Sequence, residues 1–179
     1  MVWLDDSTDF PSQELASEEG ILALGGDLSV ARLKDAYSKG IFPWFNEGDP
    51  IIWYCPLERM VLYPDEIRIS KSMRQILGKN NFKITENKAF SEVLYHCKYI
   101  HRKDQLGTWI TNSMETAYLA MYNHGYAKSI EVWQGDDLVG GLYGVDLGNG
   151  VFCGESMFSK RSNMSKVALF IWQKREVID

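Results

Sequence analysis

One short stretch near the end of the chain combines residue types that can do chemistry. It runs Gly-Glu-Ser-Met-Phe-Ser over residues 154–159 and follows an apolar run, so it predicts a buried strand that carries Glu155. Burying a carboxylate costs on the order of several kcal/mol unless the group is paired or hydrogen-bonded. Glu155 is therefore either a satisfied structural acid or an active-site group, and this stretch alone supports both interpretations equally.

Other residue types that serve catalysis occur without a suitable pattern. Cys55, Cys97 and Cys153 are odd in number and lack metal-ligand spacing, which predicts reduced thiols. His96 and His101 have no third ligand in register, so no metal site is predicted. No serine–histidine–acid or cysteine–histidine combination is evident, which favours a reaction without a covalent enzyme intermediate.

The elements that must position Glu155 form a pattern of three strands and a helix. Strands are predicted over residues 129–133 and 138–145, and the strand with Glu155 precedes a helix over about 163–174. Glycines inside the second strand indicate a bulge or a ligand that approaches the backbone. This order fits the core of an N-acyltransferase fold. The loop 159–164 has no glycine to cradle a pyrophosphate, so the predicted acyl donor is not a CoA thioester.

The upstream part of the chain mixes helices and strands. Ser29 or Asp27 is predicted to cap the first helix, and Thr111 or Asn112 to cap the last one before residue 125. The predicted helices cover residues 30–37, 71–77, 88–97 and 112–124, and the predicted strands cover 82–85 and two parts of 59–69.

The predicted fold class is α+β with two domains. A small N-terminal α/β domain is expected over residues 1–103. An acetyltransferase-like (GNAT-type) mixed sheet with helices is expected over residues 104–179, and the boundary is placed in the segment 100–107.

Aromatic residues cluster around Pro43. Phe42, Trp44 and Phe45 flank the proline, and a short predicted strand with two further aromatic residues follows. Such a group is either a corner of the core, which is the default, or a surface on which nucleobases stack.

Charge is distributed unevenly along the chain. The net charge of −5 by itself argues against a nucleic-acid partner. Residues 67–103, however, carry nine lysines and arginines against two glutamates, enough to bind a polyanion through its phosphates. The alternative is a solvated basic face. Apolar runs are too short to span a membrane and the first residues show no secretory signal pattern, so a cytoplasmic protein is expected.

Seven stretches together resemble the leucyl/phenylalanyl-tRNA–protein transferase family, bacterial aminoacyltransferases of the N-degron pathway. They occur in family order and near family spacing. The stretches are Leu22–Ser29, Gly40–Phe45, Gly107–Thr111, Ser129–Trp133, Leu138–Val145, Gly154–Ser159 and Ser165–Leu169. The resemblance implies transfer of leucine or phenylalanine, and methionine less well, from aminoacyl-tRNA to the N-terminal α-amine of proteins that begin with Arg or Lys, which marks them for degradation. The implied partners are Leu-tRNA, Phe-tRNA and these proteins, with no cofactor, metal or membrane.

The resemblance also implies roles for single residues. Trp44 and Trp109 take the family positions that sandwich the terminal adenosine, and Trp172 lies near the third aromatic position. The basic segment offers a place for the tRNA acceptor stem. The family pocket for the aminoacyl side chain carries over to Leu142, Phe152, Met157, Ser159 and Leu169, and the expected phosphate contacts are Arg68, Lys71, Arg74, Lys79 and Lys83.

The implied reaction is direct aminolysis of the aminoacyl ester. Glu155 would orient the substrates by hydrogen-bonding the aminoacyl-adenosine and by drawing in the cationic amine. The family acid that assists deprotonation lies in an Ile-Asp-Cys-Gln stretch, which Asp179 matches as the final residue here. The family's later segment is missing, which predicts a C-terminally truncated chain. Two alternatives stay open: an inactive tRNA-binding fragment and a CoA-dependent N-acetyltransferase.

Overall fold

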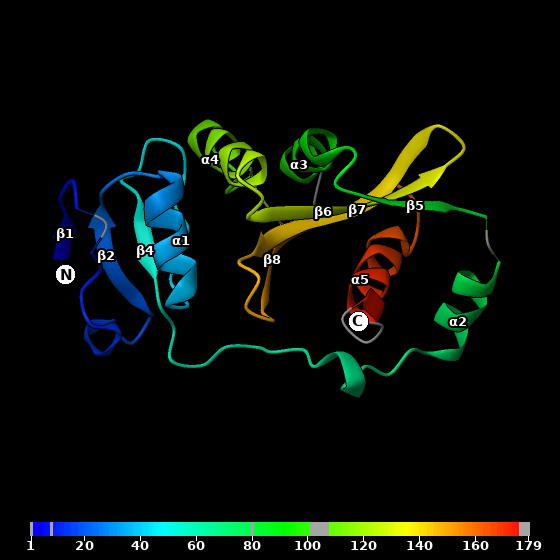
Figure 1. The fold of residues 1–179 in the computed structure, drawn as a ribbon, viewed down its shortest axis with the longest axis horizontal. Coiled ribbons are helices and arrows are strands. Elements are labelled where there is room, and N and C mark those ends of the chain that lie inside the picture. Colours follow the sequence, from blue (N-terminus) through cyan, green and yellow to red (C-terminus); the bar gives the residue numbers. More distant parts are fainter. Residues whose placement is uncertain (1, 8, 80, 101–107, 176–179) are drawn as a thin grey trace. The chain divides into compact units, whose positions relative to one another are not determined.

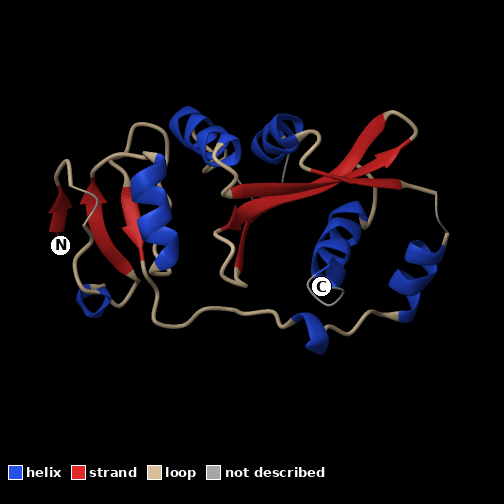
Figure 2. Cartoon of the chain, in the orientation of Figure 1, coloured by secondary structure: helices blue, strands red, loops and turns tan. Residues whose placement is uncertain are grey.

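The computed structural model of the chain describes residues 2–7, 9–79, 81–100 and 108–175, with side chains up to residue 173 (Figures 1 and 2). Contacts divide the chain into two compact units. The first takes the described residues of 1–59, 101–127 and 145–153, and the second those of 60–100, 128–144 and 154–179. The fold class is α+β as predicted, with two four-stranded sheets and five α-helices among these residues. The predicted domain boundary lies outside the described residues, so the division at residue 103 stays a prediction.

The first unit is built on a sheet with the strand order β1-β2-β4-β3. Strand β1 runs parallel to β2, whereas β4 is antiparallel to both of its neighbours. The elements of this unit are β1 (Val2–Leu4), β2 (Ile21–Gly25), α1 (Val30–Ser38), β3 (Phe42–Pro43), β4 (Ile52–Tyr54) and α4 (Asn112–Asn123), with a 3-10 turn at Gln13–Leu15.

Helices α1 and α4 begin at two of the predicted caps. The Ser29 hydroxyl accepts a hydrogen bond from the N–H of Arg32 (3.3 Å), and the Thr111 hydroxyl accepts one from the N–H of Met114 (3.2 Å). Each cap satisfies one of the backbone donors that a helix start leaves without an intrahelical partner. The two helices also meet in the core, where the hydroxyls of Tyr37 and Tyr118 lie 2.6 Å apart.

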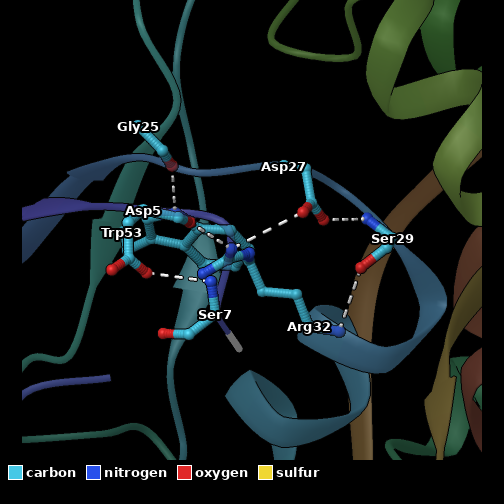
Figure 3. Close-up of polar contacts among 7 residues, drawn as sticks. All are labelled: Asp5, Ser7, Gly25, Asp27, Ser29, Arg32 and Trp53. Atoms are coloured by element: carbon cyan, nitrogen blue, oxygen red, sulfur yellow. Dashed lines mark hydrogen bonds and ion pairs between the residues drawn. The ribbon is translucent and has the colours of Figure 1, made fainter. Parts of the chain in front are cut away.

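A buried arginine holds the turn between β2 and α1 (Figure 3). Arg32 is fully buried, and its Nη2 donates to the backbone oxygen of Asp5 (2.7 Å) and to the carboxylate of Asp27 (3.5 Å). Partial burial favours the neutral form of Asp27, but hydrogen bonds from Ser29 and Arg32 outweigh it and hold its pKa below the ordinary value. Gly26 has φ +73, and a Cβ there would lie 2.9 Å from the guanidinium carbon. This position therefore requires glycine.

The second unit is built on a sheet with the strand order β5-β6-β7-β8. Strands β5 and β6 are antiparallel, and a two-residue turn joins β6 to β7 as a hairpin. The elements are a 3-10 turn at Pro64–Glu66, α2 (Lys71–Gly78), β5 (Lys83–Glu86), α3 (Phe90–Tyr99), β6 (Ala127–Gln134), β7 (Asp137–Asp146), β8 (Phe152–Ser159) and α5 (Met164–Arg175).

Two glycines inside β7 let helices approach both faces of this sheet. A Cβ at Gly140 would lie 2.5 Å from the Cβ of Met164, the first residue of α5. A Cβ at Gly141 would lie 3.2 Å from a methyl group of Val93 in α3. Successive residues of a strand point to opposite faces, so α5 and α3 cover opposite faces of the sheet, as Figure 1 shows. The sequence suggested a bulge or a ligand at these glycines. In the structure, the start of helix α5 lies against Gly140, and Val93 of helix α3 lies near Gly141.

A buried carboxylate joins β5, β6 and the segment before α3. Glu131 is fully buried, and its carboxylate accepts hydrogen bonds from the hydroxyls of Thr85 (2.5 Å) and Ser129 (2.5 Å) and from the N–H of Lys88 (3.3 Å). Trp133 extends the network through its Nε1, which donates to Thr85 (2.8 Å). Glu131 is thus a structural acid whose oxygens are occupied by protein donors.

The two strands predicted within residues 59–69 are absent, and this prediction is wrong. The stretch is irregular apart from the 3-10 turn (Figure 2). Its apolar residues Met60, Val61 and Leu62 are exposed and have no neighbouring strand with which to pair. Helix α3 also begins two residues later than predicted. No helix in the described part of the chain has the length and apolar character needed to cross a membrane.

We expect Gly140→Ala to destabilise the protein by about 1–3 kcal/mol, because the new methyl group meets the backbone of α5 and cannot rotate away. Urea unfolding followed by circular dichroism measures the change. Gly78→Ala is the matched control, since a Cβ at Gly78 meets nothing within 4 Å and alanine favours the helix there. Equal unfolding midpoints for Gly140→Ala and wild type would contradict the close helix packing.

Glu131→Ala should cost about 2–4 kcal/mol, because it leaves the buried Ser129 hydroxyl, the half-buried Thr85 hydroxyl and the N–H of Lys88 without their acceptor. Thermal unfolding compares it with Glu92→Ala, which removes an exposed carboxylate of α3. Glu131→Gln should fall between the two, since its amide accepts at only one of its two ends. Equal unfolding temperatures for all three variants would show that this hydrogen-bond network does not stabilise the protein.

Candidate functional site

Glu155 lies in the middle of β8, the last strand in the order of the second sheet. The strand is less buried than the sequence predicted. Phe158 is its buried member, Glu155 is half-buried, and Met157 is 40% exposed. Because Glu155 is only half-buried, part of its side chain stays within reach of a substrate. This position corrects the premise of a fully buried acid, and it relieves the energetic objection to a charged Glu155.

The alternation of β8 groups Glu155 with two of the predicted pocket residues. Met157 and Ser159 share its face, whereas Phe158 points to the opposite face, where its ring lies 4.9 Å from His96 of α3. The face of Glu155 is the one that α5 covers, because the Ser159 hydroxyl accepts a hydrogen bond from the N–H of Ser165 in α5 (3.2 Å).

Two further pocket residues belong to the same side of the sheet. Leu142 is buried and lies two residues after Gly140 on β7, so it points toward α5. Leu169 is a half-buried residue of α5 itself. Phe152 begins β8 within the first compact unit, and its place beside the others stays a prediction. The described geometry therefore brings an acid, a thioether and aliphatic side chains to one face of the second unit.

Ser159 has a structural task in addition to its predicted place in the pocket. Its hydroxyl donates to the carbonyl oxygen of Arg161 (2.7 Å) and accepts from the N–H of Ser165. These bonds close the turn between β8 and α5. The hydroxyl thus orients the helix that carries Leu169.

Trp44 and Trp109 lie in two segments of the first unit that contact each other. The carboxylate of Glu47 accepts a hydrogen bond from the N–H of Asn112 (3.3 Å), and each of these residues follows one of the tryptophans by three positions. Trp44 is 53% exposed and Trp109 is half-buried. An exposed indole has a face on which a nucleobase can stack.

Trp172 and Asp179 are the other two residues for which the sequence predicted a role in substrate binding or catalysis. Trp172 is buried to 8% exposure in α5, so its ring offers no open face for a base, and the structure does not support its stacking role. Asp179 lies outside the described residues, and its role as second acid stays a prediction.

The five predicted phosphate contacts are all exposed residues of the second unit, and they lie in α2, near its ends or at the start of β5. Lys71 and Arg74 are three residues apart on α2 and therefore lie on one side of the helix. Within the described part of the chain, none of the five forms an ion pair. Their charges are free to meet an external polyanion. The five residues are Arg68, Lys71, Arg74, Lys79 and Lys83.

Burial shifts the pKa of one thiol and one imidazole toward their neutral forms. Burial raises the pKa of the Cys55 thiol, which disfavours the reactive thiolate. Burial, with the charge of Lys160 as a second cause, lowers the pKa of His96. Among the described residues there is no group of three or more His, Cys, Asp and Glu side chains that could hold a metal ion.

The aromatic cluster around Pro43 divides by strand face, which sequence reasoning did not foresee. Trp53 and Pro43 are buried on one face, and the Trp53 Nε1 donates to the backbone oxygen of Gly25 (2.9 Å). Phe42, Tyr54 and the residue after β3, Trp44, remain partly exposed. The cluster is therefore a core corner and an aromatic surface at once. The signal available in the sequence was the spacing Phe42-x-Trp44 on a short strand.

Comparison with known proteins places the chain in a family. Residues 61–176 match the model of the leucyl/phenylalanyl-tRNA protein transferase family, and residues 26–57 match the model of its N-terminal domain. Relatives that bear the name leucyl/phenylalanyl-tRNA–protein transferase include proteins of Flavobacterium johnsoniae (58% identical, covering 98% of this chain and 84% of the relative) and Pectobacterium carotovorum (51% identical, covering 92% and 68%). A relative from Syntrophus aciditrophicus is 55% identical over 89% of this chain and 66% of its own length.

These matches confirm the family resemblance that the seven stretches indicated. The chain belongs to the leucyl/phenylalanyl-tRNA–protein transferase family of aminoacyltransferases.

Proposed function

We propose that the chain transfers leucine or phenylalanine, and methionine less well, from aminoacyl-tRNA to the N-terminal α-amine of proteins that begin with Arg or Lys. The reaction takes place in the cytoplasm and marks the acceptor for degradation. The observation that carries the proposal is the face of the second unit on which Glu155, Met157 and Leu142 lie beside α5. Family membership supplies the reaction class.

The transfer is a direct aminolysis. The uncharged α-amine attacks the carbonyl carbon of the aminoacyl ester, a C–N bond forms, and the C–O bond to the ribose breaks. The amine loses one proton and the departing ribose oxygen gains one. Because the amine can attack the ester directly, no covalent enzyme intermediate is needed, and binding and orientation of the two substrates supply most of the rate.

Glu155 orients the reacting groups. A half-buried carboxylate attracts the cationic N-terminus of the acceptor and accepts hydrogen bonds from the ribose or from the donor's amino group. Asp179 is the proposed second acid, which assists removal of the amine proton. Met157, Leu142 and Leu169 form the wall against which the aminoacyl side chain packs, together with Phe152 and Ser159. The thioether of Met157 adapts to both leucine and phenylalanine.

The remaining proposed contacts hold the tRNA. Trp44 and Trp109 stack on the terminal adenosine. The five exposed basic residues between Arg68 and Lys83 contact phosphates of the acceptor stem. Phosphate contacts position the tRNA without reading its sequence, which suits an enzyme that accepts more than one aminoacyl-tRNA.

A CoA-dependent acetyltransfer is disfavoured by the backbone before α5. A pyrophosphate at this place would need free N–H groups. The N–H groups of Lys160, Met164 and Ser165 donate instead to the carbonyl oxygens of Val139 and Arg161 and to the Ser159 hydroxyl. Calorimetry with acetyl-CoA tests this alternative directly.

Glu155→Gln keeps the shape of the side chain and removes its charge. We expect kcat/KM for transfer of labelled leucine from Leu-tRNA to an arginine-started peptide to fall roughly a hundredfold, as for loss of one preorganised transition-state contact.

The control is Glu92→Gln, an exposed carboxamide substitution on α3 that should retain the wild-type rate. Full activity of Glu155→Gln would remove this residue from the mechanism. If the wild-type chain binds tRNA but transfers no leucine, the chain is a tRNA-binding module and not an enzyme.

Removal of two charges from α2 tests the tRNA surface. We expect the double variant Lys71→Ala, Arg74→Ala to weaken tRNA binding and to lower the slope of log Kd against log salt by about two, one for each lost phosphate contact. Fluorescence anisotropy at several salt concentrations measures the slope. Lys39→Ala is the control, because this lysine of the first unit pairs with Asp35 at 2.7 Å. An unchanged slope in the double variant would place the tRNA elsewhere.

A further inference from the structure

The β3–β4 hairpin of the first unit presents aromatic rings on one of its faces. Phe42 and Tyr54 are direct partners across the hairpin, as are Pro43 and Trp53. Trp53 and Pro43 point to the buried face, so Phe42 and Tyr54 point to the other one. Trp44 follows β3 by one residue and keeps the ladder going, since its N–H donates to the carbonyl oxygen of Ile52 (2.9 Å). Trp44 thereby stays on the side of Phe42.

These rings form a continuous column that ends on a cation. The guanidinium carbon of Arg59 lies 4.6 Å from the ring centroid of Phe42. The ring centroids of Phe42 and Tyr54 lie 5.9 Å apart, and the two rings are stacked with an interplanar angle of 22°. The ring centroids of Tyr54 and Trp44 lie 5.6 Å apart, with an interplanar angle of 53°. The Arg59 Nη1 also donates to the carbonyl oxygen of Gly40 (3.2 Å), which anchors the column at the end of the turn after α1.

The column reduces the loss of side-chain entropy that accompanies ligand binding to the exposed ring of Trp44. Trp44 is 53% exposed, and a side chain that is free in solution loses roughly 0.5–1.5 kcal/mol of rotamer entropy when a ligand immobilises it. Contact with Tyr54 restricts the indole beforehand. Phe42 and Arg59 restrict Tyr54 in turn, because a planar guanidinium stacks well on an aromatic face.

We infer that Arg59, Phe42 and Tyr54 are positioning residues that hold the Trp44 ring ready for a nucleobase of the donor tRNA. This inference rests on the proposed stacking of Trp44 on the terminal adenosine. Arg59 acts through its planar stacking on Phe42 and makes no phosphate contact, which separates it from the basic residues of α2.

The experiment compares Tyr54→Leu and Arg59→Lys with wild type in the leucine transfer assay. We expect KM for Leu-tRNA to rise about fivefold to tenfold in both, with kcat within about twofold, because preorganisation affects donor binding and leaves the reacting groups unchanged. Tyr54→Phe keeps the aromatic ring and should therefore have the same KM as wild type. Tyr99→Leu is the matched control: this tyrosine of α3 is 59% exposed and also contacts one neighbouring ring, Tyr95, at 4.7 Å.

Two readouts separate positioning from other roles. Arg59→Lys keeps the positive charge, so a phosphate contact predicts a wild-type KM for it and a salt slope that falls only in Arg59→Gln. The positioning role predicts a raised KM for Arg59→Lys and an unchanged salt slope for Arg59→Gln. Fluorine NMR of protein labelled with fluorotryptophan, assigned with Trp44→Phe, should show one narrow Trp44 resonance in wild type and a broadened or shifted one in Tyr54→Leu.

The outcomes also distinguish this inference from the proposed function. If Trp44→Ala leaves KM for Leu-tRNA unchanged, adenosine stacking on Trp44 is wrong and the column has no task in donor binding. If Trp44→Ala raises KM but Tyr54→Leu and Arg59→Lys do not, the stacking proposal stands and the positioning inference is overturned. A KM that rises in the Tyr99→Leu control as well would also overturn it.

Discussion

Helix α5 lies directly on β7 because residue 140 has no side chain, and the candidate site of the second unit depends on this contact. A Cβ at Gly140 would stand 2.5 Å from the Cβ of Met164. The close approach sets where α5 begins, and the Ser159 hydroxyl then ties the end of β8 to the N–H of Ser165. Leu142, two residues along β7, faces the same helix. One missing methyl group thus determines which side chains surround the face of Glu155.

Two buried charged groups fix the surroundings of the sites. Arg32 binds the backbone of Asp5 and the carboxylate of Asp27, and so holds the turn after β2, next to the Gly25 oxygen that receives the Trp53 indole. Glu131 binds three donors and joins β5 to β6. Both groups are costly to bury. Glu131 is held by three donors, whereas Arg32 is held through Nη2 alone, and its Nε and Nη1 have no hydrogen-bond partner in the described part of the chain. Their rigidity matters because a reaction that depends on orientation tolerates little movement of its binding groups.

The reaction proposed for this family member depends more on the orientation of its substrates than on acid–base catalysis by side chains. Burial raises the pKa of the Cys55 thiol, and the described residues contain no group of three or more His, Cys, Asp and Glu side chains that could hold a metal ion. They offer a half-buried carboxylate, an apolar wall, an exposed tryptophan and unpaired cations. Such groups suit the proposed binding of a tRNA and of an acceptor amine. The aromatic column under Trp44 follows the same logic, since it prepares a ring for its ligand before the ligand arrives.

The sequence by itself determined the α+β class, the strands around Glu155 and the family, and it narrowed two helix starts to Ser29 or Asp27 and to Thr111 or Asn112; the structure selected Ser29 and Thr111. These features are local: a cap depends on a residue three positions away, and a strand pattern repeats every second residue. Tertiary structure alone decided that residues 59–69 form no strands, that Trp172 is buried, that Gly140 receives a helix and that Phe42, Tyr54 and Arg59 stack beneath Trp44. Each of these depends on which distant segment comes to lie beside a residue, and the spacing of residues along the chain carries no information about that neighbour.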